Sequence, residues 1–213
     1  MLAAKSPTRR PMSKFTSSPA RLEAFSDGVI AVIITIMVLE LKVPSQNGLA
    51  GLLAILPTLA IYLLSFTFTG IYWINHHHLV HRIREADQRI LYTNLGFLFC
   101  LSLIPFFTSY LIEKEIESFS VALYAVSMIV IALSFLFLRL AISRRLRLED
   151  SFEQEDIATQ RKHWMSLGLY LIAVPLSFYH PYLALAIIAL VMIVWIIPTA
   201  RIGPCEEEHP KQF

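Results

Sequence analysis

An ionisable side chain stands inside a segment that otherwise reads as a hydrophobic membrane span. Ser26 and Asp27 follow Phe25 directly and precede the apolar run 29–39. Ionisable groups within membrane segments are unfavourable there, so by default they mark a function or a buried partner. Because a carboxylate facing lipid would lose its hydration, we expect Asp27 to point into a helix bundle and to accept hydrogen bonds there.

The natural donors for Asp27 lie at the end of the second hydrophobic segment. That segment ends in an indole, an amide and several imidazoles: Trp73, Asn75, His76, His77, His78 and His81. We expect Asp27 to accept from Trp73, from His76 or from both, and Asn94 in the third segment to join the network. Polar groups hold helices together in membranes, so a structural lock is favoured over a chemical site. Such a structural network would still determine the rotation of the first helix, and hence which of its faces points away from the neighbouring helices.

The adjacent histidines also raise a metal-binding hypothesis. His77 and His81 are one helical turn apart, as zinc ligands on a helix would be. However, adjacent histidines on a helix point in different directions, and we find no second cluster of Cys, Asp or Glu at membrane depth. Hydrogen-bonded anchors or pH-sensitive groups are the favoured interpretation of these histidines, and no metal site or cofactor is expected.

The composition is that of a membrane protein. Of the 213 residues, 56% are hydrophobic, and they occur in long blocks, whereas soluble domains contain about 45–50% apolar residues. A span needs ~20 apolar helical residues. Six stretches qualify: 23–43, 51–80, 90–112, 119–142, 162–179 and 181–199. The predicted fold is therefore an all-α polytopic membrane protein with six transmembrane helices.

The distribution of basic residues predicts the orientation. All of the 18 Lys and Arg residues except Lys42 and Lys114 lie in or next to the segments before the first span, between spans two and three, between spans four and five, or after the sixth. The positive-inside rule then places both termini in the cytoplasm. Residues 1–20 are expected to form a disordered basic arm that contacts anionic lipid rather than nucleic acid. The membrane domain is assigned to 21–200 and a cytoplasmic tail to 201–213.

The first span separates into two faces when its residues are placed on a helix of 3.6 residues per turn. One stripe, small or apolar with a single hydroxyl, contains Phe25, Gly28, Val32, Thr35 and Leu39. Asp27 lies more than a quarter-turn from that stripe. The acidic edge and the apolar edge of this helix are therefore expected to have different neighbours.

The start of this helix resembles a known family. Arg21, Phe25, Ser26 and Asp27 form the pattern Arg-x3-Phe-Ser-Asp, which is similar to the signature of the transmembrane-protein-175 potassium channels of animal endolysosomes and bacteria. Further positions that resemble the family are Trp73, His76, Asn94 and Pro105. The resemblance covers roughly residues 20–199.

This resemblance implies a channel, not an enzyme, without a re-entrant selectivity loop. The sequence agrees, since it contains no Thr-Val-Gly-Tyr-Gly-like segment. In the family the first helices surround the pore, and a single six-span repeat would assemble as a homotetramer. The implied setting is a cell membrane, the inner membrane of a bacterium. The resemblance also assigns a group of residues to a structural polar network: Arg21, Phe25, Ser26, Asp27, Trp73, His76 and Asn94.

The resemblance further implies which residues line the pore. Val32 and Leu39 match the hydrophobic constriction, and Thr35 matches the threonine that contributes to potassium preference. The family often has Ile or Leu where this chain has Val32, so Leu39 or Ile36 is an alternative narrowest point. The implied function is a cation channel with modest potassium selectivity, permeant to K+ and other monovalent cations.

Three alternatives compete with a channel. A proton-coupled transporter would use Asp27 and His76, but such proteins usually have broken helices at the membrane midplane, and Gly28 lies near the cytoplasmic end. A membrane metalloenzyme would need a ligand set that the sequence does not supply. A purely structural membrane protein remains the fourth possibility.

Overall fold

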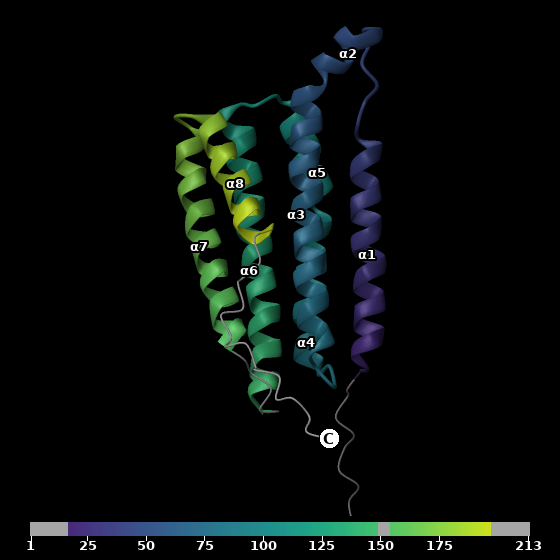
Figure 1. The fold of residues 1–213 in the computed structure, drawn as a ribbon, viewed down its shortest axis with the longest axis vertical. Coiled ribbons are helices and arrows are strands. Elements are labelled where there is room, and N and C mark those ends of the chain that lie inside the picture. The colour runs from purple at the N-terminus through teal and green to yellow at the C-terminus, as the bar shows by residue number, and fades with distance from the viewer. Residues whose placement is uncertain (1–16, 149–153, 197–213) are drawn as a thin grey trace, which may run out of the picture.

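A computed structural model describes residues 17–148 and 154–196, which form a bundle of long helices (Figure 1). The helices, in chain order, are α1 (Pro19–Leu39), α2 (Gly48–Ala54), α3 (Leu56–His81), α4 (Gln88–Ser102), α5 (Ile104–Glu113), α6 (Ser118–Leu148), α7 (Gln154–Ser177) and α8 (Pro181–Ile196). The described residues contain no β-strand, only an isolated bridge between Ser17 and Ala86. The all-α prediction is confirmed. Most of the predicted arm 1–20 and all of the predicted tail 201–213 lie outside the described residues.

Prolines and one aspartate set several helix boundaries. Proline stands in the first turn of α1, α3 and α5, where its missing N–H leaves no hydrogen bond unmade. Pro105 thereby divides the predicted third span into α4 and α5, with the break at Leu103. Asp87 caps α4, because its Oδ1 accepts a hydrogen bond of 2.9 Å from the backbone N–H of Ile90.

Four helical stretches are long and apolar enough to cross a membrane: Pro19–Leu39, Leu56–His81, Gln88–Glu113 and Ser118–Arg147. They correspond to the first four predicted spans. α8 is a shorter apolar helix, and the predicted hairpin is present, since α7 ends at Ser177 and α8 begins at Pro181. The predicted span 162–179 overlaps α7 as far as Ser177. That helix is long enough to span but too polar to meet the same criterion, because polar residues 160–163 reduce its mean hydropathy.

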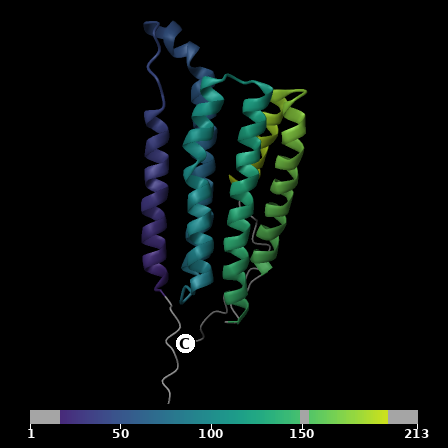
Figure 2. The same ribbon diagram turned by 180° about the vertical axis from the view of Figure 1, so that it is seen from behind.

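The bundle has α1 at one edge and α7 with α8 at the other (Figure 1). The view from behind shows α4 and α5 following one another between α1 and α6 (Figure 2). α1 packs mainly on α3, with further contacts to α4 and α5, whereas α6 packs on α4, α5, α7 and α8. The beginning of α1, the α3–α4 connection and the end of α6 lie at the same end of the bundle (Figure 1), which we call the basic end.

An aromatic cluster fills the centre of the bundle. The ring of Tyr72 lies 5.2–5.7 Å from the rings of Phe68, Phe97 and Phe135, and Phe68 contacts Tyr170 of α7. These rings come from α3, α4, α6 and α7, and they are all buried. The aromatic cluster therefore joins α3, α4, α6 and α7, while α1 adds its buried apolar side chains to the edge of the hydrophobic core.

Candidate functional site

The first helix presents two different faces. Its buried face consists of residues at three- and four-residue spacing: Leu22, Ser26, Ile30, Ile33 and Met37. The opposite face is open and apolar, with Phe25, Val32 and Leu39 exposed by 55%, 53% and 79%. Gly28, Thr35 and Ile36 are also exposed. The stripe expected from the periodicity of the sequence is thus largely exposed in a single chain.

Thr35 is the one hydroxyl on that open stripe. Its Oγ1 donates a hydrogen bond of 2.9 Å to the carbonyl oxygen of Val32, within the same helix. The proton is therefore used internally, while the oxygen lone pairs stay available on an exposed surface. The arrangement gives the stripe an oxygen acceptor between two apolar positions.

A buried chain of hydrogen bonds ties α1 to α4 and α3. Ser26 Oγ donates to the carbonyl oxygen of Leu22 at 2.8 Å and accepts from Asn94 Nδ2 at 3.0 Å. The Oδ1 of Asn94 lies 2.7 Å from His76 Nε2. An amide oxygen only accepts, so Nε2 is the donor in this contact. We call Ser26, Asn94 and His76 the buried tier, because each is at most 1% exposed.

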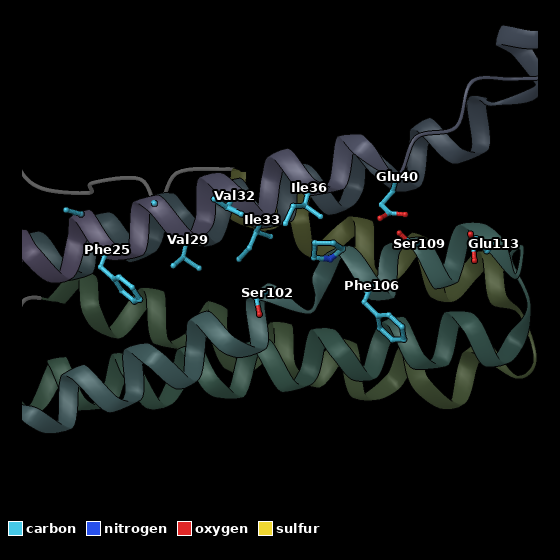
Figure 3. Close-up of a pocket in the computed structure, with 13 residues that line it drawn as sticks. Phe25, Val29, Val32, Ile33, Ile36, Glu40, Ser102, Phe106, Ser109 and Glu113 are labelled. Carbon is cyan, nitrogen blue, oxygen red and sulfur yellow. The ribbon is translucent and has the colours of Figure 1, made fainter.

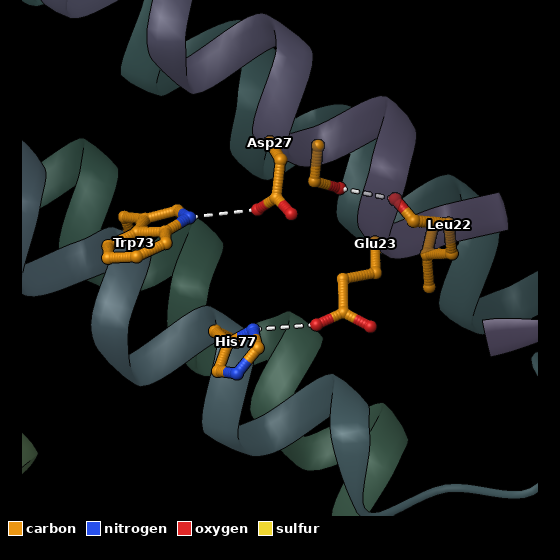
Figure 4. A network of polar contacts seen from close by, with 6 residues as sticks. Leu22, Glu23, Asp27, Trp73 and His77 are labelled. Carbon is orange, nitrogen blue, oxygen red and sulfur yellow. Dashed lines mark hydrogen bonds and ion pairs between the residues drawn. The ribbon is translucent and has the colours of Figure 1, made fainter. Parts of the chain in front are cut away.

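A second pair of contacts lies at the periphery of the same helices (Figure 4). Trp73 Nε1 donates to Asp27 Oδ1 at 2.8 Å, and His77 Nδ1 lies 2.6 Å from Glu23 Oε1. Glu23 and Asp27 are one turn apart on α1, as Trp73 and His77 are on α3. These four residues form what we call the outer tier, which is partly exposed.

Of the two donors expected for Asp27, the structure brings only Trp73 to it. His76 bonds to Asn94 instead, because it belongs to the buried stripe of α3 that contains Tyr72 and Leu79. Its ring is stacked on Phe97 of α4, with centroids 5.8 Å apart. Asn94 does join the network, through Ser26 rather than through Asp27.

Two residues assigned to the network lie apart from it. Arg21 and Phe25 are both exposed, and Phe25 borders a groove described below. The histidines also have separate contacts: the rings of His77 and His81 are stacked at 5.8 Å, while His77 contacts Glu23. Within the described part of the chain, no three His, Cys, Asp or Glu residues are grouped so that they could hold a metal ion.

An open groove of about 910 Å³ runs along α1 beside the junction of α4 and α5 (Figure 3). Its walls are mostly apolar, with Val32 and Ile36 from α1 facing Phe106 from α5. Glu40 and Glu113 stand at the end away from the basic end (Figure 3). The hydroxyl of Ser109, which also lines the groove, is buried and has no hydrogen-bond partner among the described residues.

An ion pair closes the same end of the groove. Lys42, in the segment after α1, lies 2.8 Å from Glu113 at the end of α5. The neighbouring Glu113 carboxylate raises the pKa of Lys42 above its usual value. Both side chains are largely exposed, so the pair joins the two segments only weakly.

Sequence reasoning missed a buried hydroxyl cluster between α3, α5 and α6. Thr108 Oγ1 donates to Ser65 Oγ at 2.8 Å, and Ser65 Oγ lies 2.9 Å from the phenol oxygen of Tyr124. Hydroxyls in membrane helices commonly bond to their own backbone, so their presence alone gives no signal of a partner. The contact depends on how three helices are rotated.

Comparison with known proteins places this geometry in a family. The model of the family "Endosomal/lysosomal potassium channel TMEM175" matches residues 21–105, which contain both tiers. A potassium channel of Chryseobacterium sp. (strain P1-3) is 42% identical over 189 residues, or 89% of this chain and 98% of the relative. This chain belongs to the TMEM175 family.

The TMEM175 fold is also found in a solved structure. A crystal structure of a lysosomal potassium-selective channel TMEM175 homologue from Chamaesiphon minutus matches with a TM-score of 0.70 and 28% identity, covering 84% of this chain and 96% of that one. Human TMEM175, described as an endosomal/lysosomal proton channel, is 31% identical over 121 residues, which are 48% of this chain and 23% of the human protein. The chain is thus a membrane protein with the fold of a TMEM175-type channel.

Proposed function

We propose that this protein is a cation channel with modest potassium selectivity, whose pore lies on the axis of a homotetramer and is lined by α1. The observation that carries this proposal is the open stripe of α1, where apolar side chains flank the oxygen of Thr35. The potassium-channel names of the Chryseobacterium and Chamaesiphon relatives support the choice of ion. No cofactor is proposed; K+ and other monovalent cations are the permeant species.

The two tiers support an axial position for the stripe. They attach the buried and acidic sides of α1 to α3 and α4, so the rotation of α1 about its own axis is fixed. Four copies around one axis would then present rings of Val32, Thr35 and Leu39. Rings of apolar side chains exclude ions by dewetting, and oxygen ligands replace part of a hydration shell. We propose Val32, Ile36 and Leu39 as the hydrophobic constriction and Thr35 as the selectivity ring.

The groove beside α1 supports assembly from copies of this chain. One flank of α1 faces the groove with Val32 and Ile36, while the other flank exposes the smaller side chains of Ala31 and Val38. In a ring of identical subunits each interface is heterologous, so one flank of α1 meets the opposite flank of the next copy. We propose that the small flank of a neighbouring α1 occupies the groove, where it would cover the unpaired hydroxyl of Ser109. The ring would lie in a bacterial cell membrane with both termini cytoplasmic.

The proposal is tested by current through purified protein in planar bilayers under opposed K+ and Na+ gradients. We expect a reversal potential displaced toward the potassium equilibrium value. Thr35→Val should move it toward zero because the oxygen ring is lost, and Thr35→Ser, which keeps the oxygen, should retain the preference. An unchanged reversal potential in Thr35→Val would contradict the selectivity role, and no current from tetrameric protein would contradict the channel.

Proton-coupled transport is the second candidate; the name of human TMEM175, an endosomal/lysosomal proton channel, supports proton movement but not its coupling to a substrate. A relay would pass between Asp27 and His76, yet in the structure these residues bond to Trp73 and Asn94 in separate tiers. That separation favours the channel. Proton uptake into vesicles that requires a co-transported substrate would instead favour the transporter.

A further inference from the structure

A small cavity lies between α3, α6, α7 and α8, away from α1. Its volume is about 20 Å³, and its walls combine aromatic rings such as Phe135 and Tyr170 with three polar side chains, Asn75, His163 and Ser166. A site needs about 10–15 Å³ and several polar partners to hold one water molecule. The cavity has this room and takes no part in the proposed pore.

His163, which lines this cavity, has an unpaired ring nitrogen. The residue is 2% exposed, and its Nε2 lies 2.8 Å from the carbonyl oxygen of Ala132 in α6. Since a carbonyl oxygen only accepts, Nε2 carries the proton, and Nδ1 of the neutral ring is left as an acceptor. That Nδ1 is buried and has no partner among the described residues. A buried acceptor without a donor is unfavourable unless a water molecule supplies one.

Two neighbours on the cavity wall have hydrogen-bonding capacity left over. Ser166 Oγ donates to the carbonyl oxygen of Lys162 at 2.8 Å and accepts from Trp195 Nε1 at 2.8 Å, which leaves one lone pair. Asn75 Nδ2 donates to the carbonyl oxygen of Ile71 at 2.8 Å, which leaves one N–H. His163 Nδ1, Ser166 Oγ and Asn75 Nδ2 thus supply two acceptors and one donor, a set that one water molecule can satisfy.

We propose that this cavity is a binding site for one structural water molecule. The water donates to His163 Nδ1 and to Ser166 Oγ, and it accepts from Asn75 Nδ2. It thereby connects α3 to α7, on the side of α3 opposite to the tiers that hold α1. The basic end of α3 is then anchored from both sides, by α1 and α4 through the tiers and by α7 through the water. This site does not depend on the proposed ion pathway.

A high-resolution structure of the full chain in lipid nanodiscs tests the proposal directly. We expect a density peak about 2.7–3.2 Å from His163 Nδ1. His76 is the internal control, because its Nδ1 is also buried and unpaired but the residue does not line this cavity. An empty cavity in a map that resolves other buried water molecules would overturn the proposal.

A pair of variants separates the two nitrogens of the ring. In His163→Gln the amide can reach the position of Nε2 and keep the bond to Ala132, but it leaves nothing at the position of Nδ1. In His163→Asn the amide oxygen lies near the position of Nδ1, while the bond to Ala132 is lost. We expect the water peak to vanish in His163→Gln and to persist in His163→Asn. Full occupancy in His163→Gln would overturn the assigned contact. If either variant fails to fold, the ¹⁵N chemical shift of His163 Nδ1 in the unmodified protein provides the test. The proposal predicts the shift of an unprotonated nitrogen that accepts a hydrogen bond, and the shift of an unprotonated nitrogen without a hydrogen bond would overturn it.

Discussion

Helices α1 and α6 are both long and apolar, yet they are held in opposite ways. In the most apolar 18-residue window of each, 28% of α1 is buried, compared with 61% of α6. α6 contacts α3, α4, α5, α7 and α8, whereas α1 is attached along one side only, by a buried apolar stripe and by hydrogen bonds. Apolar packing makes α6 part of the scaffold, and the hydrogen bonds of α1 fix its rotation while leaving one face available for other copies.

The largest effect on stability and assembly is expected from Asn94→Leu, which removes the hydrogen bonds of the buried tier. This change leaves the Nε2 proton of His76 without its acceptor and removes the donor to Ser26. Each buried group left unpaired costs about 1–3 kcal/mol. We expect a markedly lower thermal unfolding midpoint and loss of the assembled oligomer in detergent, measured by size-exclusion chromatography with light scattering.

The matched control for that variant is Thr93→Ala. Thr93 precedes Asn94 on α4, but its hydroxyl bonds only to the backbone of its own helix, at Arg89 and Ile90. Its replacement should leave the midpoint nearly unchanged. Equal destabilisation by the two variants would mean that the buried tier has no special importance.

A smaller effect, on current rather than stability, is expected from Leu39→Asn. Leu39 is 79% exposed in the single chain, so a polar side chain there costs little in folding. If four such residues face the axis, the amides should wet the constriction and raise the current severalfold in planar bilayers. Leu190→Asn is the control, because Leu190 is also exposed but lies on α8, at the edge of the bundle opposite α1 (Figure 1). An equal rise in both variants would place the constriction elsewhere.

The smallest effect is expected from Glu23→Gln in the outer tier. The Glu23–His77 pair is partly exposed, and such pairs contribute about 0–1 kcal/mol. We therefore predict a shift of the unfolding midpoint much smaller than that of Asn94→Leu, seen in the same assay. If Glu23→Gln lowered the unfolding midpoint as much as Asn94→Leu does, the outer tier would contribute as much stability as the buried tier.

The sequence was sufficient for the features that depend on one helix at a time. Runs of apolar residues predicted the positions of the long helices, and the periodicity of α1 predicted which of its residues stay exposed. The polar segment 160–163 shows the limit of this approach, because it overlaps the start of the span 162–179, which was predicted on length. The break at Leu103 was not predicted either, although Pro105 carried the signal for it.

Features that depend on several helices could not be predicted in the same way. The partner of His76 is decided by the rotation of α3, which the aromatic packing around Tyr72 and Phe97 sets. Likewise, Ser65 meets Thr108 and Tyr124 only because three helices converge. His163 was not predicted to be part of a site, because its partner is a backbone carbonyl of α6. Every residue has such a carbonyl, so the sequence does not indicate which one accepts the hydrogen bond.

The central claim, that the open stripe of α1 faces an aqueous axis, is tested most directly by cysteine accessibility in the assembled protein. In a background with Cys100 and Cys205 replaced by Ser, single cysteines along α1 would be exposed to a charged, water-soluble thiol reagent during current recording. We predict that modification at positions 32, 35 and 39 changes the current and that modification at the buried positions 30, 33 and 37 does not. Current changes confined to another helix, with the α1 stripe unreactive, would contradict the account.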